Sequence, residues 1–112
     1  MNSETADRRR TFRDIAHGRT GDKGDVANIS LIAHDPADFP LLLAHATAER
    51  VEALFRPLGV RRVTRYELAN IGALNFVLEG ALAGGVNRSL RLDRHGKSLA
   101  GLLLALPVVD AD

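Results

Sequence analysis

The chain has 112 residues, and its 15 Lys and Arg against 14 Asp and Glu give a net charge of +1. This near-neutral charge excludes the strongly basic surface that is typical of a nucleic-acid-binding domain. It contains no cysteine, which excludes disulfides, thiolate catalysis and zinc–thiolate sites. No apolar run approaches the roughly 18–20 residues of a membrane span, so we expect one cytoplasmic domain with neither a nucleic-acid nor a membrane partner.

The N-terminal half predicts a β-hairpin. Residues 11–17 can form a first strand. Val26–Ala33 predicts a second strand, because its apolar residues alternate with the polar Asn28 and Ser30. The glycine-rich segment 18–25 between them is the expected hairpin tip.

Two helices and a strand are predicted next. Asp35 suits the N-cap of a helix that begins at Pro36. Thr47 suits the N-cap of a second helix, whose apolar residues recur at i, i+3, i+4 and i+7. Gly59 ends this helix, and residues 60–68 predict the next strand.

A third helix is predicted after Asn70, its candidate N-cap. Leu74, Val77 and Leu78 recur at helical spacing, Gly80 lies within the pattern, and Gly84-Gly85 end it. Residues 86–93 then predict a strand. Ser98 suits the N-cap of a last helix, which Pro107 ends.

This order, β-β-α-α-β-α-β-α, predicts an α+β fold. We expect a ferredoxin-like two-layer sandwich of about four strands with helices on one face. The predicted domain covers residues 11–107, between a disordered leader over 1–10 and a short tail over 108–112.

The hairpin tip is the first candidate site, because a hydrophobic core has no use for its charges. Backbone N–H groups of its glycines could bind an anion, with charge from Arg19 and Lys23. Asp22 and Asp25 would instead suit a hydroxyl, an amine or a divalent cation. The simpler alternative is a turn whose ions pair with one another. The candidate ligand-binding residues here are Arg19, Thr20, Gly21, Asp22, Lys23, Gly24 and Asn28.

A second candidate segment follows the third predicted helix and comprises Gly84, Gly85, Arg88 and Ser89. An arginine on a core-facing side must be paired or await an anion, so Arg88 is predicted either to bind a ligand or to pair with Glu67 or Glu79. Asn70 and Asn75 flank the start of the predicted helix, where free N–H groups favour an anion. Capping alone is the alternative for Asn70.

His17 is the histidine that we consider for proton transfer, because it adjoins the glycine-rich segment. With Asp22 and Asp25 it completes the candidate acid/base residues. No histidine has the ligand spacing of a metal site, so we expect no bound metal.

Four blocks of the sequence resemble one family. They are residues 19–25 with Asn28, residues 65–70, residues 73–82, and residues 88–93 with Gly96-Lys97. In this order they are similar to the small ferredoxin-fold domain at the C-terminus of AtuA-type acyclic terpene utilisation proteins, which also occurs as a free-standing chain. The resemblance covers residues 13–106. It implies a link to bacterial catabolism of branched terpenoid acids as CoA thioesters, and it carries no established catalytic residue.

These observations leave three functions open. The first is an accessory subunit that completes a site on a separately encoded AtuA-like chain, or binds that site's acyl ligand, with acyl-CoA as the ligand and no cofactor. The second is a small stand-alone enzyme acting on a carboxylate or acyl-CoA, and the third is a self-associating domain without a ligand. The first predicts an apolar surface left open on the isolated chain, and the second predicts a closed pocket that contains the loop.

Overall fold

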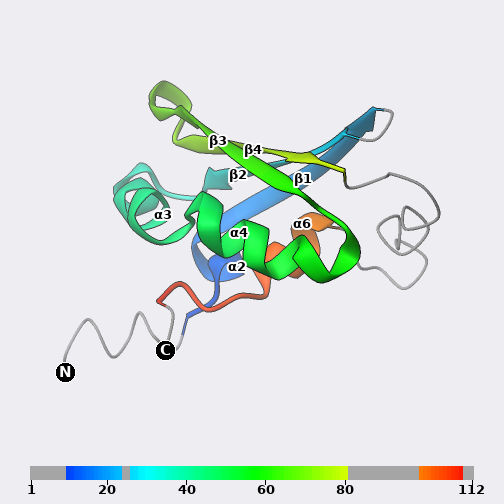
Figure 1. Ribbon diagram of the computed structural model, residues 1–112. Helices are drawn as coiled ribbons and strands as arrows, with labels where there is room; N and C mark the ends of the chain where they lie inside the picture. The colour runs from blue at the N-terminus through cyan, green and yellow to red at the C-terminus, as the bar shows by residue number, and fades with distance from the viewer. Residues whose placement is uncertain (1–9, 24–25, 81–98, 110–112) are drawn as a thin grey trace.

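The fold is built on one antiparallel sheet. The computed structural model describes residues 10–23, 26–80 and 99–109 (Figure 1). Its four strands lie in the order β1-β2-β4-β3. They are β1 (Ala16–Lys23), β2 (Val26–Ala33), β3 (Arg62–Leu68) and β4 (Ala73–Glu79).

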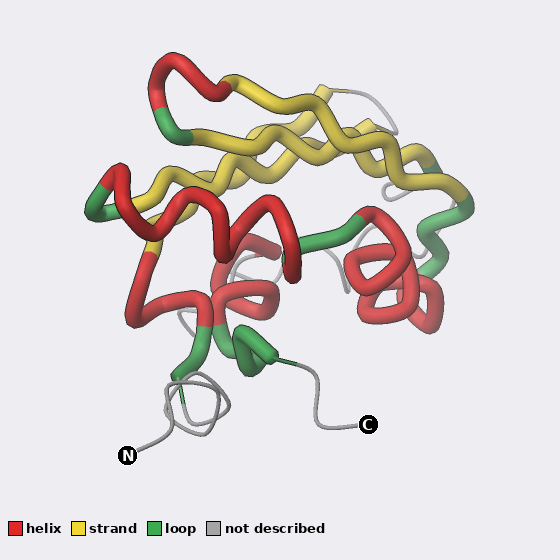
Figure 2. The backbone as a smooth tube through the Cα atoms, turned by 90° about the vertical axis from the view of Figure 1, so that its left-hand side faces the viewer, coloured by secondary structure: helices red, strands yellow, loops and turns green. Residues whose placement is uncertain are grey.

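The described helices form the second layer. All of them lie on one side of the sheet, and they leave its other side, the outer face, uncovered (Figures 1 and 2). This is the expected ferredoxin-like α+β sandwich. No helix in the described part of the chain is long and apolar enough to cross a membrane. The helices are α2 (Phe12–Ile15), α3 (Phe39–His45), α4 (Ala48–Phe55) and α6 (Leu99–Leu104).

The core lies between these layers. Alternate residues of β2 and β4 face the helices, because successive side chains of a strand point to opposite faces, and all of them but the partly buried Ala33 are buried. The helices contribute Phe55 and Leu103, both fully buried. The buried inner-face residues of the two central strands are Ala27, Ile29, Leu31, Leu74, Phe76 and Leu78.

The helix predicted after Asn70 is wrong, because this segment forms the central strand β4. Leu74 and Leu78 fit a helical stripe, but together with Phe76 they also alternate as in a strand. Pairing with β2 on one side and β3 on the other satisfies the backbone of this segment. Gly80 has φ 87°, a left-handed conformation that ends the strand.

The strand predicted over residues 11–17 is also wrong in its first half. Phe12 and Ile15 lie on the buried side of the short helix α2, whereas a strand would place them on opposite faces. The Asp14 carboxylate accepts a hydrogen bond of 2.8 Å from the Thr11 N–H and stabilises the start of this helix. β1 therefore begins only at Ala16.

Both predicted N-caps in the middle of the chain are confirmed. Asp35 accepts a hydrogen bond of 2.9 Å from the Ala37 N–H, and this cap begins the 3₁₀ turn η1 (Pro36–Asp38) that precedes α3. The Thr47 hydroxyl accepts one of 3.2 Å from the Arg50 N–H at the start of α4. Gly59, with φ 105°, reverses the chain after the 3₁₀ turn η2 (Arg56–Leu58), as expected of the residue that ends this helical segment.

The last predicted elements are only partly within the described residues. Gly84-Gly85, the strand over 86–93 and the Ser98 cap lie outside them, whereas the last helix is present as α6. The N–H of the fully buried Val108 donates to the Arg10 carbonyl at 2.8 Å. The packed body therefore includes Arg10 and Val108, which the predicted boundaries placed in the leader and the tail.

Candidate functional site: the outer face of the sheet

The register of the sheet places four polar or aromatic residues in one row across the outer face. Arg19 on β1 lies opposite Ser30 on β2, Ser30 lies opposite Asn75 on β4, and Asn75 lies opposite Tyr66 on β3. Each belongs to the set of alternate residues that points away from the helices. The row, which we call the polar row, thus joins a cation, a hydroxyl, an amide and a phenol from four strands.

Within the polar row, Ser30 and Asn75 are in contact. The Ser30 hydroxyl donates to the amide oxygen of Asn75 at 3.5 Å, a long hydrogen bond between half-buried side chains. Arg19 is exposed, and its guanidinium group has no ion pair or hydrogen bond with another described residue. Its charge is therefore available to an incoming anion.

A second row lies beside the first and explains one of the loop glycines. Gly21 pairs with Asn28, which pairs with Val77. A Cβ atom on Gly21 would lie 2.9 Å from the side-chain oxygen of Asn28. The missing side chain of Gly21 thus leaves room for the exposed amide of Asn28 to lie over β1.

Exposed apolar side chains lie at the end of β3 and in the turn that follows it. Tyr66 is 52% exposed, Leu68 is 40% exposed and Ile71 is 61% exposed, which is unusual for large hydrophobic residues. Leu68 follows Tyr66 on the same face of β3, and Ile71 belongs to the adjoining 3₁₀ turn η3 (Ala69–Ile71). The outer face therefore carries a free cation near β1 and exposed apolar surface near β3.

Thr20 does not lie on the outer face. It points to the helices, where its hydroxyl accepts a hydrogen bond of 2.8 Å from the N–H of Ala100 in α6. This bond ties β1 to the start of α6. The structure thus gives Thr20 a role in holding a helix in place.

His17 lies near the start of β1, because residues 18–23, which were expected in the hairpin tip, continue this strand to Lys23. It pairs with Ile32, and its ring stacks on that of His34 with centroids 5.4 Å apart. Lys23 lies six positions further along the extended strand, at a distance of about 20 Å. The described structure therefore does not bring His17 together with Asp22 near the end of the strand.

The remaining predicted residues fall in other places. The backbones of Asp22 and Lys23 pair with those of Ala27 and Val26. Asn70 is exposed in η3 and lines a cavity of about 240 Å³ that also includes Phe39 and Ile71. Because β4 is a strand, Asn70 caps no α-helix and does not lie in the polar row with Asn75. The predicted site residues Gly24, Asp25, Gly84, Gly85, Arg88 and Ser89 lie outside the described residues.

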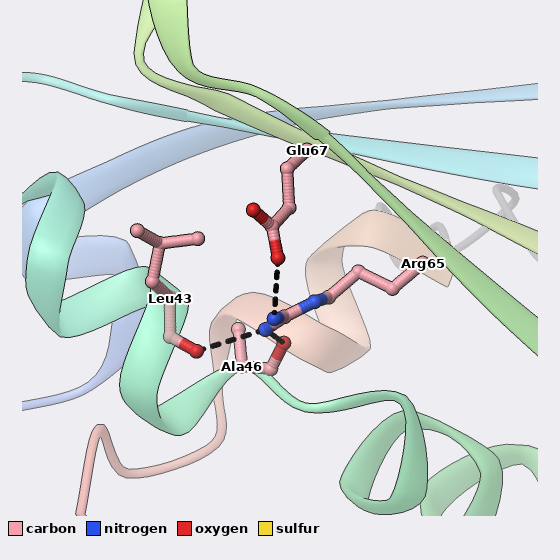
Figure 3. Close-up of polar contacts among 4 residues, drawn as sticks. All are labelled: Leu43, Ala46, Arg65 and Glu67. Carbon is pink, nitrogen blue, oxygen red and sulfur yellow. Dashed lines mark hydrogen bonds and ion pairs between the residues drawn. The ribbon is translucent and has the colours of Figure 1, made fainter.

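The sequence does not indicate the role of Arg65, which reaches from β3 to the end of α3 (Figure 3). Its guanidinium group donates to the carbonyls of Leu43 at 2.9 Å and Ala46 at 3.0 Å, and it pairs with Glu67 at 3.0 Å. Glu67, considered as a partner for Arg88, thus already has a cation beside it. No local signal predicts this contact, because its partners lie 19 and 22 residues away.

Metal ligands do not cluster in the part of the chain that the structure describes. No three His, Asp or Glu side chains there lie close enough together to hold a metal ion. The chemistry that the described outer face offers is recognition by a cation, small polar groups and apolar side chains.

Comparison with known proteins agrees with the fold. Residues 10–109 match the family model of the AtuA ferredoxin-like domain, which is nearly the whole of the sequence. No curated protein and no solved structure matches the chain.

Proposed function

Since the chain belongs to the AtuA ferredoxin-like domain family, we propose that it is an accessory domain that docks through its outer face onto a large AtuA-type chain. Its context is the bacterial catabolism of branched or terpenoid acyl-CoA compounds. The observation that carries the proposal is the outer face itself, which no described helix covers and on which Tyr66 and Leu68 are exposed.

The shape of this face favours a protein surface over a small molecule. Small-molecule sites are concave and enclose most of their ligand, whereas exposed apolar patches rimmed by polar groups mark protein contacts. Two cavities lined by described residues lie away from the polar row, one beside η3 and one between Leu54 on α4 and Leu106. An accessory binding role therefore fits these residues better than a stand-alone enzyme.

The charge of Arg19 defines the partner's chemistry. A guanidinium group without an acidic neighbour binds carboxylates and phosphates in a planar, two-pronged geometry. In the proposed complex it contacts an acidic side chain of the large chain, or the anionic group of an acyl ligand held between the two. The hairpin tip lies at the end of the same strand and is proposed to contribute to that ligand site.

The proposal is tested by measuring the affinity of the purified domain for the purified large AtuA-type chain. Arg19→Glu should weaken binding by at least about tenfold, because it places a carboxylate where the partner presents an anion. The matched control is Arg56→Glu, since Arg56 is an exposed arginine on the helical side. Equal affinities for the two variants, or no binding by the unaltered domain, would refute docking through the outer face.

The ligand part is tested on the same complex. A CoA thioester bound at a shared site should tighten the association of the two chains, because binding linkage is reciprocal. Asp22→Ala and Lys23→Ala in the hairpin should remove that gain while they leave the affinity without thioester unchanged. A gain that survives both substitutions would exclude the hairpin from the ligand site.

A further inference from the structure

Among the described strands, β3 lies at one edge of the sheet. It pairs with β4 along one edge, and no other described strand pairs with the opposite edge. Its seven residues, RVTRYEL, contain neither proline nor glycine, so the strand is long and regular. Such an edge presents backbone N–H and C=O groups on which another strand can add.

We propose that the occupant of this edge is a second copy of the chain, whose β3 pairs antiparallel with the first around a twofold axis at Tyr66. Identical strands pair in this way when the axis is perpendicular to the sheet, and a residue on the axis then lies opposite itself. Both copies keep their helices on the same side. The result is one continuous sheet of eight strands.

The charges of β3 select this register. With the axis at Arg65, two guanidinium groups would meet, and with the axis at Glu67, two carboxylates would meet; both arrangements are repulsive. With the axis at Tyr66, Arg65 of each copy lies opposite Glu67 of the other. Arg65 and Glu67 lie two residues apart, so an axis at either of them brings like charges together. An axis at Tyr66 brings opposite charges together, and this register is therefore favoured.

On the helical side of the paired β3 strands, which we call the inner side of the seam, Arg65 is already held in place. Arg65 is held by the carbonyls of Leu43 and Ala46 and by its own Glu67, whose side chain is still 55% exposed. The Glu67 carboxylate of the second copy therefore meets an arginine that is already oriented. Two guanidinium groups and two carboxylates alternate across the axis, and little side-chain freedom is lost when they meet.

The outer side of the seam brings apolar groups together. Tyr66 meets Tyr66 of the second copy, and Leu68 lies opposite Thr64. Pairs of aromatic residues directly opposite each other stabilise antiparallel strands. The pairing covers part of the exposed Tyr66 and Leu68 side chains, which the proposed docking surface also includes. It leaves Arg19, Ser30 and Asn75 of the polar row free for the docking.

The first test uses the fact that residue 66 lies opposite itself. The unaltered chain should be a dimer by analytical ultracentrifugation. Tyr66→Asp and Tyr66→Lys should each raise its dissociation constant by at least about tenfold, because like charges meet on the axis. An equimolar mixture of the two variants should restore a heterodimer. Asn28→Asp on β2 is the control and should leave the dimer intact.

The second test fixes the register. The chain has no cysteine, so Tyr66→Cys introduces a single thiol. Opposite Cα atoms about 4.5–5.5 Å apart permit a disulfide, so oxidation should link the two copies. Thr64→Cys places the two thiols about 13 Å apart and should not link them. A monomeric unaltered chain, dimers that persist in both charged variants, or equal cross-linking from position 64 would overturn the proposal.

Discussion

The guanidinium groups of Arg50 and Arg65 both donate to carbonyls at the C-terminal end of α3. Arg65 donates to the carbonyls of Leu43 and Ala46, and Arg50 donates to the carbonyl of His45 at 3.0 Å. The last carbonyls of a helix have no partner within the helix, and positive charge is favourable there. The two arginines thus supply hydrogen-bond donors to the carbonyls of Leu43, His45 and Ala46 at this helix end.

Arg65→Ala should therefore lower the free energy of unfolding by about 2–3 kcal/mol, because it leaves the carbonyls of Leu43 and Ala46 without their donor. Urea unfolding followed by circular dichroism measures this change. Arg56→Ala is the control, because Arg56 makes only an exposed pair with Glu52 and should change the stability by less than about 0.5 kcal/mol. Similar losses for the two variants would contradict the role assigned to Arg65.

For single residues, contacts between positions close in the sequence could be predicted, and contacts between positions far apart in the sequence could not. The caps at Asp35 and Thr47 bond to N–H groups two and three residues along the chain, so their residue types and positions suffice. The Thr20 hydroxyl bonds to Ala100, 80 residues away. Thr20 is a predicted ligand-binding residue because it belongs to the glycine-rich segment, and nothing near it in the sequence indicates the helix that it contacts.

Among the elements, β1 shows how glycines on the two faces of one strand differ. A Cβ atom on Gly18 would lie 3.1 Å from the Ser30 carbonyl oxygen and 3.3 Å from the Cβ of Ala100 in α6. On the outer face, a Cβ on Gly21 meets only the side chain of Asn28. The first position is confined by backbone and a packed helix, and the second by a movable amide.

Gly18→Ala is thus expected to lower the free energy of unfolding by about 1–3 kcal/mol, because β1 and α6 must move apart. Gly21→Ala should displace only the Asn28 amide and remain close to the unaltered protein in stability. Thermal denaturation of both variants provides the comparison. A Gly21→Ala variant that is less stable than Gly18→Ala would contradict this, because the tighter contact would then lie on the outer face of β1.

The local sequence determines the type of some secondary-structure elements, such as β2, and leaves that of others, such as β4, ambiguous. The apolar alternation of β2 has one interpretation, and the strand is present as predicted. In β4 the spacings of Leu74, Phe76 and Leu78 satisfy a strand, while Leu74, Val77 and Leu78 satisfy a helix. The choice depends on β2 and β3, which pair with this segment on both sides, and a local pattern contains no information on those partners.

On the scale of the whole molecule, the two faces of the sheet differ in what covers them. The helices bury the inner face, and the described structure leaves the outer face and the free edge of β3 exposed (Figure 2). These two surfaces point in different directions. A second copy can therefore pair along the edge while a large AtuA-type chain occupies the outer face.

The candidate site was predictable only in part at this scale. Arg19, Asn28 and Asn75 were chosen from the sequence, and the sheet places all three on the outer face. The sequence predicts Asn75 near the start of a helix, whereas it lies in strand β4 and contacts Ser30. Strand register brings them together, and register depends on pairing between segments far apart in the sequence.

Site-directed cross-linking tests the docking of the outer face most directly. Asn75→Cys places a single thiol in the polar row, and Glu49→Cys places one at an exposed position of α4 on the helical side. Each variant carries a photoreactive label and is irradiated with the large AtuA-type chain. We predict a covalent product from position 75 and none from position 49. Cross-linking from position 49 alone would contradict the account, because the partner would then bind the helices.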